Sequence, residues 1–307
     1  MDKISVIVPC YNEEEGIVEF YNEVRKHLEE IENTQYELIF IDDGSKDGTL
    51  KVMRELCRKD PDCHYLAFSR NFGKEAAMYA GLQNATGDYC VIMDADLQHP
   101  PELLKPMYHA VSQEGYDCCG GKRLDRTGEG TVRNWLSRRF YGVMNKLTNM
   151  EIQDGVGDFR MMSRKMTEAV LMMKEYNRYT KGIFAFVGFE TKWLEFHNRE
   201  RCAGTSKWNF KSLFSYALEG VLAFSTIPLT YAGIFGSIFI AISLIAFLVL
   251  GGFWIAGKTI TLLMLVIPIL LLISGIQMIF MYILGCYFSR DYMENKKRPI
   301  YIVKEQG

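Results

Sequence analysis

Residues 4–13 read ISVIVPCYNE, a short apolar run that ends in a polar and acidic turn. Similar β-rich runs occur at residues 36–41, 64–69 and 89–93. Between these runs, apolar side chains recur at helical spacing, namely at Ile17, Phe20, Tyr21, Val24, Leu28 and Ile31 and at Leu50, Met53 and Leu56. This alternation predicts an α/β domain with a largely parallel sheet and helices on both of its faces.

Side chains capable of chemistry follow each of the four runs. They are residues 9–13, residues 42–45, residues 69–73 and the triplet Asp94-Ala95-Asp96. Because ligands of open α/β sheets bind at the carboxyl ends of the strands, we expect these four loops to form one site.

Asp94 and Asp96 give the sharpest local signal. Two carboxylates one residue apart at a strand end can point to the same side and share a hard divalent cation. Such a cation would neutralise the charge of a leaving diphosphate. Asp-x-Asp alone is common in solvated loops, but here it follows an apolar strand at the expected sheet edge.

Asp42 and Asp43 begin a turn that leads into a helix. One interpretation is structural, with Ser45 or Asp47 as the helix N-cap. A functional interpretation adds hydrogen bonds from a uracil edge or a ribose hydroxyl, with residues 9–13 as the other wall of the pocket. The sequence contains neither a GxGxxG fingerprint nor a Walker P-loop, so dinucleotide oxidoreductases and NTPases lose their main support.

Two long apolar runs occupy the carboxyl-terminal third. Residues 220–257 and 259–289 contain no charged side chain, and Lys258 separates them. A helix over residues 229–253 would be roughly 37 Å long, enough to cross a hydrocarbon core of ~30 Å. The pattern predicts two membrane spans, and the alternative is a pair of buried core helices.

The flanks of these runs predict their orientation. Residues 290–298 carry four basic side chains, and residues 1–8 show no signal peptide, so we expect the α/β domain in the cytoplasm. Residues 208–222 pattern as an amphipathic helix at the membrane interface, whereas 133–147 fit an interface helix or a solvated helix equally. We divide the chain into an α/β catalytic domain at 1–207, an interface helix at 208–226, a membrane hairpin at 227–289 with spans at about 229–253 and 262–286, and a basic tail at 290–307.

Charge, cysteine spacing and glycine content bear on possible partners, on metal or disulfide sites, and on oligomers. The net charge of −2 gives no indication of a nucleic-acid partner. The eight cysteines show no metal-ligand spacing, so we expect neither zinc nor disulfides. Glycines in the apolar runs would permit close packing of helices and thus a homo-oligomer.

Four ordered blocks carry a resemblance to a known family. Residues 5–14, 41–49, 69–77 and 93–102 resemble the sequential motifs of inverting family-two glycosyltransferases. The subgroup they resemble is the polyprenyl-phosphate glycosyltransferases, which include bactoprenol glucosyltransferases and dolichyl-phosphate mannose synthases. The resemblance runs from residue 4 to about 211, and the paired apolar runs fit the bactoprenol glucosyltransferase branch.

The resemblance implies a GT-A fold, a Rossmann-like domain with a mixed sheet. It implies that Asp94 and Asp96 hold Mg²⁺ or Mn²⁺, with Asp96 also counted as catalytic. Asp158 is the implied catalytic carboxylate, although Asp154 is close enough in sequence to be confused with it. The residues implied to contact the nucleotide-sugar are Pro9, Tyr11, Glu13, Asp42, Asp43, Lys74, Asp94, Ala95 and Gln98.

A lipid phosphate as acceptor would be anionic already, so the harder task is to bring two anions together. Arginine is the better bidentate partner for phosphate. The candidates for the lipid phosphate are Arg123, Arg126, Arg201, Ser206 and Lys207. Each arginine among them could equally form an ordinary surface ion pair.

The resemblance therefore implies transfer of a hexose, from UDP-glucose and with inversion, to undecaprenyl phosphate. The expected place is the cytoplasmic face of a bacterial inner membrane. GDP-mannose or UDP-GlcNAc as donor remains an alternative, and so does a non-catalytic nucleotide-binding scaffold. A processive polysaccharide synthase is disfavoured because the sequence lacks a Gln-x-x-Arg-Trp block and further apolar runs.

Overall fold

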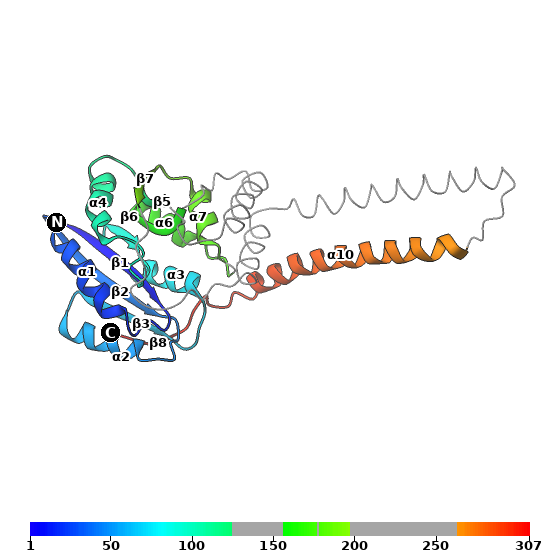
Figure 1. Ribbon diagram of the computed structural model, residues 1–307, viewed down its shortest axis with the longest axis horizontal. Helices are drawn as coiled ribbons and strands as arrows, with labels where there is room; N and C mark the ends of the chain where they lie inside the picture. Colours follow the sequence, from blue (N-terminus) through cyan, green and yellow to red (C-terminus); the bar gives the residue numbers. More distant parts are fainter. Residues whose placement is uncertain (125–155, 177, 197–262) are drawn as a thin grey trace. The chain divides into compact units, whose positions relative to one another are not determined.

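The computed structural model describes residues 1–124, 156–176, 178–196 and 263–307 (Figure 1). The chain forms two compact units, residues 1–220 together with 299–307, and residues 221–298. The predicted interface helix at 208–226 and the first predicted span at 229–253 lie outside the described residues.

The described part of the first unit contains an eight-stranded sheet with the order β7-β5-β6-β4-β1-β2-β3-β8. Its centre is parallel, because β1 pairs with both β2 and β4, and β2 pairs with β3. The bounds of these strands are β1 Asp2–Cys10, β2 Thr34–Asp42, β3 Cys63–Phe68 and β4 Tyr89–Ile92. All four strands predicted from the sequence are confirmed.

Antiparallel pairing makes the sheet mixed. The remaining strands are β5 Cys118–Arg123, β6 Val156–Ser163, β7 Thr191–Phe196 and β8 Val303–Gln306. β6 lies antiparallel between β4 and β5, β7 is parallel to β5, and β8 is antiparallel to β3. The mixed α/β sheet implied by the resemblance is confirmed.

Helices cover both faces of the sheet. α1 packs against α2 and α4, whereas α3 packs against α6, and α6 against α7. Their bounds are α1 Ile17–Glu29, α2 Thr49–Lys59, α3 Lys74–Asn84, α4 Leu104–Ser112, α6 Arg164–Met172 and α7 Thr180–Val187, with a short 3₁₀ turn at Pro101–Leu103.

From Ile4 to Val8, β1 is apolar except for Ser5, because both faces of this central strand are buried. Ile4, Val6 and Val8 belong to the core that α1 covers. On the other face, a Cβ atom at Gly81 would lie 2.2 Å from Cγ2 of Ile7. Glycine at this position therefore lets α3 approach the sheet closely, and the amino-terminal residue of α3 is Lys74.

The carboxyl-terminal residues return to the first unit. The division by sequence grouped residues 290–307 as a basic tail, but in the structure Val303–Gln306 forms β8 at the edge of the sheet. α10, Leu263–Asn295, belongs to the second unit and overlaps the predicted span at 262–286. Among the described residues, no helix has both the length and the mean hydropathy of a membrane span.

Candidate active site

The loops that follow β1 and β2 are joined by hydrogen bonds. The backbone N–H of Asn12 donates to Oγ of Ser45 (2.9 Å), and Oδ1 of Asn12 accepts from the N–H of Lys46 (2.8 Å). The N–H of Glu13 donates to Oγ1 of Thr49 (2.8 Å). Two of the predicted loops thus form one wall, as expected at the carboxyl edge of a parallel sheet.

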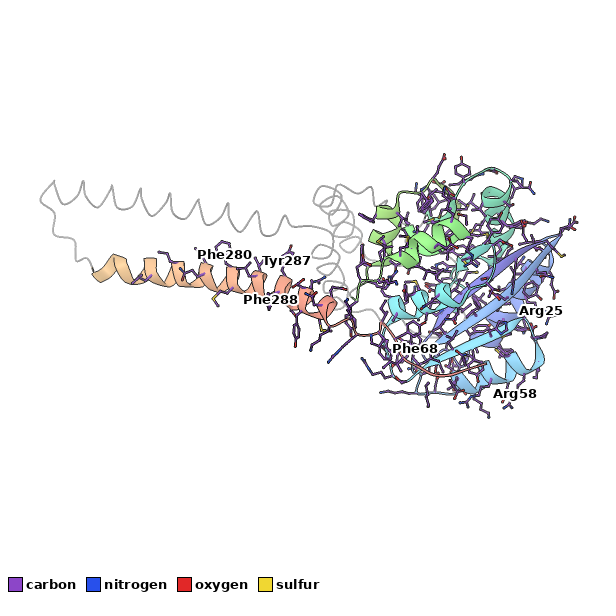
Figure 2. All side chains as sticks on the ribbon, turned by 180° about the vertical axis from the view of Figure 1, so that it is seen from behind. Arg25, Arg58, Phe68, Phe280, Tyr287 and Phe288 are labelled. Atoms are coloured by element: carbon purple, nitrogen blue, oxygen red, sulfur yellow. The ribbon has the colours of Figure 1, made fainter. Side chains whose placement is uncertain are left out.

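Asp43 joins this wall to the loop after β3. Its carboxylate accepts hydrogen bonds from the N–H groups of Phe72 (2.6 Å) and Gly73 (2.9 Å). Gly44 has φ +70°, and a Cβ there would lie 2.6 Å from the carbonyl carbon of Arg70, so only glycine fits between the loops. Figure 2 shows Phe68, at the carboxyl end of β3, at the opposite end of the domain from Arg25 and Arg58.

Asp42, Asp43 and Asp47, the three acidic residues of the turn at 42–47, differ in their contacts. The predicted N-cap at Ser45 or Asp47 is wrong, because the N-cap residue of α2 is Gly48. Asp47 still accepts hydrogen bonds from the N–H (3.1 Å) and Oγ1 (2.6 Å) of Thr49, the first residue of the helix. Asp42 is buried and accepts a hydrogen bond from the N–H of Ser45 (3.0 Å). Burial is the main cause that raises the pKa of Asp43 from the ordinary 3.8 to about 6.

We expect the Asp43→Asn variant to remove a pH dependence of stability. The folded state binds the proton of Asp43 more tightly than the unfolded state does, so protonation of Asp43 stabilises the fold. This stabilisation is complete below pH ~4 and is lost as the pH rises through ~6. From pH 4 to pH 7 the wild type should lose up to about 3 kcal/mol relative to the variant. Thermal unfolding midpoints of both full-length proteins across this range check the result. A constant difference between the two would contradict the raised pKa.

One ammonium group joins the fourth loop to β6. Nζ of Lys74 lies 2.7 Å from Oδ1 and 2.9 Å from Oδ2 of Asp94, and 2.9 Å from Oδ2 of Asp158. Lys74 begins α3, Asp94 follows β4, and Asp158 lies in β6, which is the antiparallel neighbour of β4. The structure therefore brings together residues that the sequence separates widely.

The charges of this cluster stabilise one another. Burial alone would raise the pKa of Asp158, but the charges of Lys74 and Lys181 outweigh it and hold this pKa well below its usual range. The pKa of Asp94 is lowered by Lys74 in the same way, against burial. Burial would lower the pKa of Lys74, yet Asp158 and Asp94 raise it. The cluster is thus two carboxylates that share one cation, and Oδ1 of Asp158 is buried with no hydrogen-bond partner.

His99 supports the loop that carries Asp94, a role that sequence reasoning missed. Its Nδ1 accepts a hydrogen bond from the N–H of Asp94 (3.4 Å), and its ring stacks on Phe159 with centroids 4.8 Å apart. Burial lowers the pKa of His99, so the neutral form with its proton on Nε2 fits this arrangement. The sequence feature that could have indicated this role is the position of His99, three residues after Asp96.

The backbone around Asp96 is strained. Leu97 has φ +55°, which is uncommon for a residue with a branched side chain, and its side chain is buried in the core. The N–H of Gln98 donates to Oδ1 of Asp96 (3.1 Å). Core packing of Leu97 thus fixes a tight turn that presents both Asp96 and Gln98.

The remaining predicted site residues lie partly within and partly outside the described residues. Pro9 is half-buried near the carboxyl end of β1, and Tyr11 and Glu13 follow that strand. Ala95 is buried between the two carboxylates of its triplet. Arg123 is the last residue of β5 and is half-buried. The predicted residues that lie outside the described ones are Arg126, Asp154, Arg201, Ser206 and Lys207.

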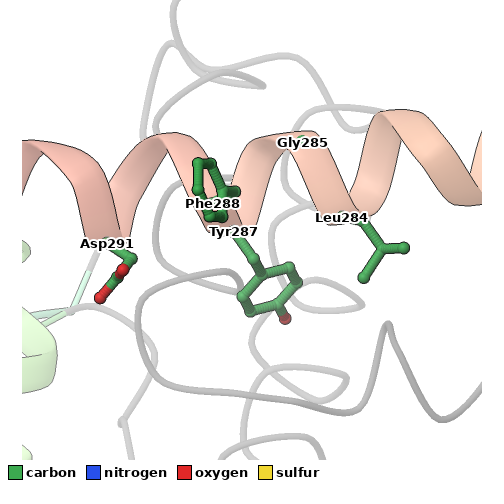
Figure 3. A pocket seen from close by; sticks show the side chains of 5 residues that line it. All are labelled: Leu284, Gly285, Tyr287, Phe288 and Asp291. Carbon is green, nitrogen blue, oxygen red and sulfur yellow. The ribbon is translucent and has the colours of Figure 1, made fainter.

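A wide-open surface depression of about 610 Å³ lies along α10 in the second unit (Figure 3). Its lining consists of Leu284, Gly285, Tyr287, Phe288 and Asp291. With one acidic group and three large apolar side chains, it offers none of the clustered charges found in the first unit.

The carboxylates of Asp94 and Asp96 fit a metal ion that takes its remaining ligands from a substrate. Within the described ranges, no group of three or more His, Cys, Asp or Glu side chains is arranged to hold a metal ion. Asp94 and Asp96 supply hard oxygen ligands, and Mg²⁺ commonly binds one or two carboxylates together with substrate phosphates. The pair therefore suits a metal that arrives with a diphosphate.

Comparisons with known proteins show the family to which the chain belongs. The model of the family described as glycosyl transferase family 2 matches residues 5–171. The chain is 41% identical to a prophage bactoprenol glucosyl transferase homolog of Escherichia coli (strain K12), over 98% of each chain. It is 40% identical to the bactoprenol glucosyl transferase of Shigella phage SfX, over 99% of each. It is also 40% identical to the putative glycosyltransferase CsbB of Bacillus subtilis (strain 168), over 98% of this chain and 91% of that one.

The chain belongs to glycosyl transferase family 2. It is a glycosyltransferase, and the cluster of Lys74, Asp94 and Asp158 at the carboxyl edge of its sheet is the candidate active site.

Proposed function

We propose that this protein transfers a hexose from a nucleotide-sugar, UDP-glucose, to the phosphate of a polyprenyl lipid such as undecaprenyl phosphate. The observation that carries the proposal is the ammonium of Lys74 shared by Asp94 and Asp158. This ammonium lies between Asp94, the carboxylate that we propose for the donor diphosphate, and Asp158, the one that we propose for the acceptor. Relatives that match over nearly their full length are named for bactoprenol glucosyl transfer.

The donor would lie along the wall formed by the loops after β1, β2 and β3. Asp42 is proposed to accept a hydrogen bond from the nucleotide, while Asp43 holds the loop at residues 72–73 in place through two backbone N–H groups. Asp94 and Asp96 would hold Mg²⁺ or Mn²⁺, which supplies charge neutralisation to the diphosphate when bound. Lys74 adds a second positive charge on the same side.

The acceptor needs little help from a base. A phosphate monoester has its second pKa near 6, so its oxygen is largely anionic at neutral pH. Asp158 is a weak base because its pKa is held low by the neighbouring cations. Its proposed role is to fix Lys74 and the alignment of the acceptor, so that attack on the anomeric carbon comes from the face opposite the diphosphate and inverts the configuration.

We also propose that the chain is a membrane protein with its catalytic domain in the cytoplasm of a bacterial cell. The charge-free runs at 220–257 and 259–289 support this. β8 follows both runs in sequence, yet it pairs with β3 of the catalytic sheet. Two segments of one sheet must lie on the same side of a bilayer, so this pairing favours an even number of spans between them.

A donor screen tests the proposed function. Purified full-length protein with Mn²⁺ would receive UDP-glucose, UDP-GlcNAc or GDP-mannose in turn, with and without a short-chain polyprenyl phosphate. We expect release of UDP from UDP-glucose to rise steeply when the lipid is added. A lipid-dependent release of GDP instead would identify the mannose alternative. Nucleotide binding without lipid-dependent release from any donor would contradict the proposal and favour the non-catalytic scaffold.

A further inference from the structure

The carboxyl-terminal segment, residues 299–307, lies against the elements that carry the donor loop at residues 69–73. The backbone O of Ile302 accepts a hydrogen bond from the N–H of Ser69 (3.0 Å), the first residue of that loop. β8 continues from this contact along β3. The segment therefore reaches the carboxyl edge of the sheet, where the candidate active site lies.

One side chain of the segment contacts both the strand that precedes the donor loop and the helix that follows it. The ring of Tyr301 stacks on Phe68, which precedes the loop, with centroids 5.0 Å apart and planes 21° apart. On the other side it meets Tyr79 of α3 edge-on, with centroids 6.5 Å apart. Its hydroxyl donates to Oε1 of Gln83, also in α3 (2.8 Å). Tyr301 thus joins the strand before the loop to the helix after it.

The far end of the segment is fixed independently. Glu305 accepts two hydrogen bonds from the guanidinium of Arg54 in α2 (2.7 and 2.6 Å), a bidentate pair. Tyr65 and Gly307 exchange two backbone hydrogen bonds, of 2.7 and 3.1 Å. These contacts set the register of β8 and hold Tyr301 at a defined place.

The donor loop itself carries the groups on which the site depends. Its residues Phe72 and Gly73 donate N–H groups to Asp43, and Lys74 follows immediately. A shift of Phe68 relative to α3 would therefore disturb the hydrogen bonds from Phe72 and Gly73 to Asp43 and the position of the Lys74 ammonium. Small displacements in such constellations reduce activity strongly.

We propose that Tyr301 is a positioning residue for the nucleotide-sugar site, through its contacts with Phe68 and α3. This inference rests on the proposed function and extends it to a residue from the opposite end of the chain. It makes the segment that follows the predicted spans a structural part of donor binding.

The test is the affinity of the full-length protein for UDP and for GDP in the presence of Mn²⁺, measured by calorimetry. We expect Tyr301→Ala to weaken binding of the preferred nucleotide by about tenfold and to raise the KM for the donor accordingly. Tyr301→Phe keeps the stacking and should restore most of the affinity.

Two control variants separate positioning from general loss of stability. Ile302→Ala removes an exposed side chain of the same segment and keeps every backbone hydrogen bond, so we expect wild-type affinity. Leu28→Ala creates a cavity beneath α1 and should lower the unfolding midpoint without changing nucleotide affinity.

The outcomes distinguish the two proposals. If the wild type binds nucleotide and Tyr301→Ala binds it equally well, or if Leu28→Ala weakens binding as much, the positioning role is overturned. If the wild type binds neither nucleotide, the proposed function fails first. Weakened nucleotide binding in Tyr301→Ala together with near-wild-type binding in Tyr301→Phe would support the inference.

Discussion

The Asp158→Asn variant is expected to transfer sugar about 10²- to 10³-fold more slowly than the wild type, with nucleotide affinity little changed. The substitution keeps the shape of the side chain but removes the negative charge that lies 2.9 Å from Nζ of Lys74. Lys74 would then pair with Asp94 alone, and its ammonium would no longer be held in the position that aligns the acceptor. Initial rates at saturating donor and lipid measure the effect.

The matched control for Asp158→Asn is Asp62→Asn, on the exposed loop before β3. It makes the same chemical change outside the cluster and should leave the rate unchanged. A full rate in Asp158→Asn would remove Asp158 from the mechanism and turn attention to Asp154. A loss of nucleotide affinity as large as the loss of rate would show that Asp158 acts on the donor rather than on the acceptor.

The second large effect is expected from Asp96→Asn, which should abolish transfer while the fold is retained. Asp96 is proposed as a metal ligand, and loss of one of two carboxylates leaves the donor diphosphate poorly neutralised. Titration of Mn²⁺ into wild type and variant in the presence of UDP measures the metal affinity directly, and circular dichroism checks the fold.

Asp62→Asn again provides the control for the metal titration. Near-normal turnover of Asp96→Asn, or unchanged Mn²⁺ affinity with UDP present, would refute the metal assignment. Because the binding titration needs no acceptor lipid, its result is independent of which lipid the enzyme uses.

The sequence predicted the centre of the fold because the relevant signals are local. The run at 36–41 alone indicated the strand found at Thr34–Asp42, and helical spacing indicated α1 and α2. The expectation that four loops would meet followed from the geometry of parallel sheets, and the bonds of Asn12 and Asp43 confirm that the loops after β1, β2 and β3 meet.

The edges of the sheet could not be predicted in the same way. β5 reads CCGGKR and β8 reads VKEQ, so neither has a strong β-rich pattern of its own. Their pairing is determined by distant partners, such as Leu66 for Gln306. Such contacts leave no local pattern, and for that reason the carboxyl-terminal segment was interpreted only as a basic tail.

The candidate site shows the same limit. The pattern around Asp94 and Asp96 predicted a site from residue types and position, and the resemblance supplied Asp158. The ammonium of Lys74 between Asp94 and Asp158 depends on the packing of α3 against the sheet, which the close approach at Gly81 permits. The support that His99 gives to Asp94 depends likewise on stacking with Phe159 from β6.

The most direct test of a glycosyl transfer site facing a lipid phosphate is the mass of the lipid itself. Purified full-length protein would be incubated with UDP-glucose, Mn²⁺ and short-chain polyprenyl phosphate, and the lipid extracted for mass spectrometry. The site described here predicts a gain of one hexosyl residue on the phosphate, lost in Asp158→Asn. An unchanged lipid mass with UDP-glucose, UDP-GlcNAc and GDP-mannose alike, from protein that binds nucleotide, would contradict it.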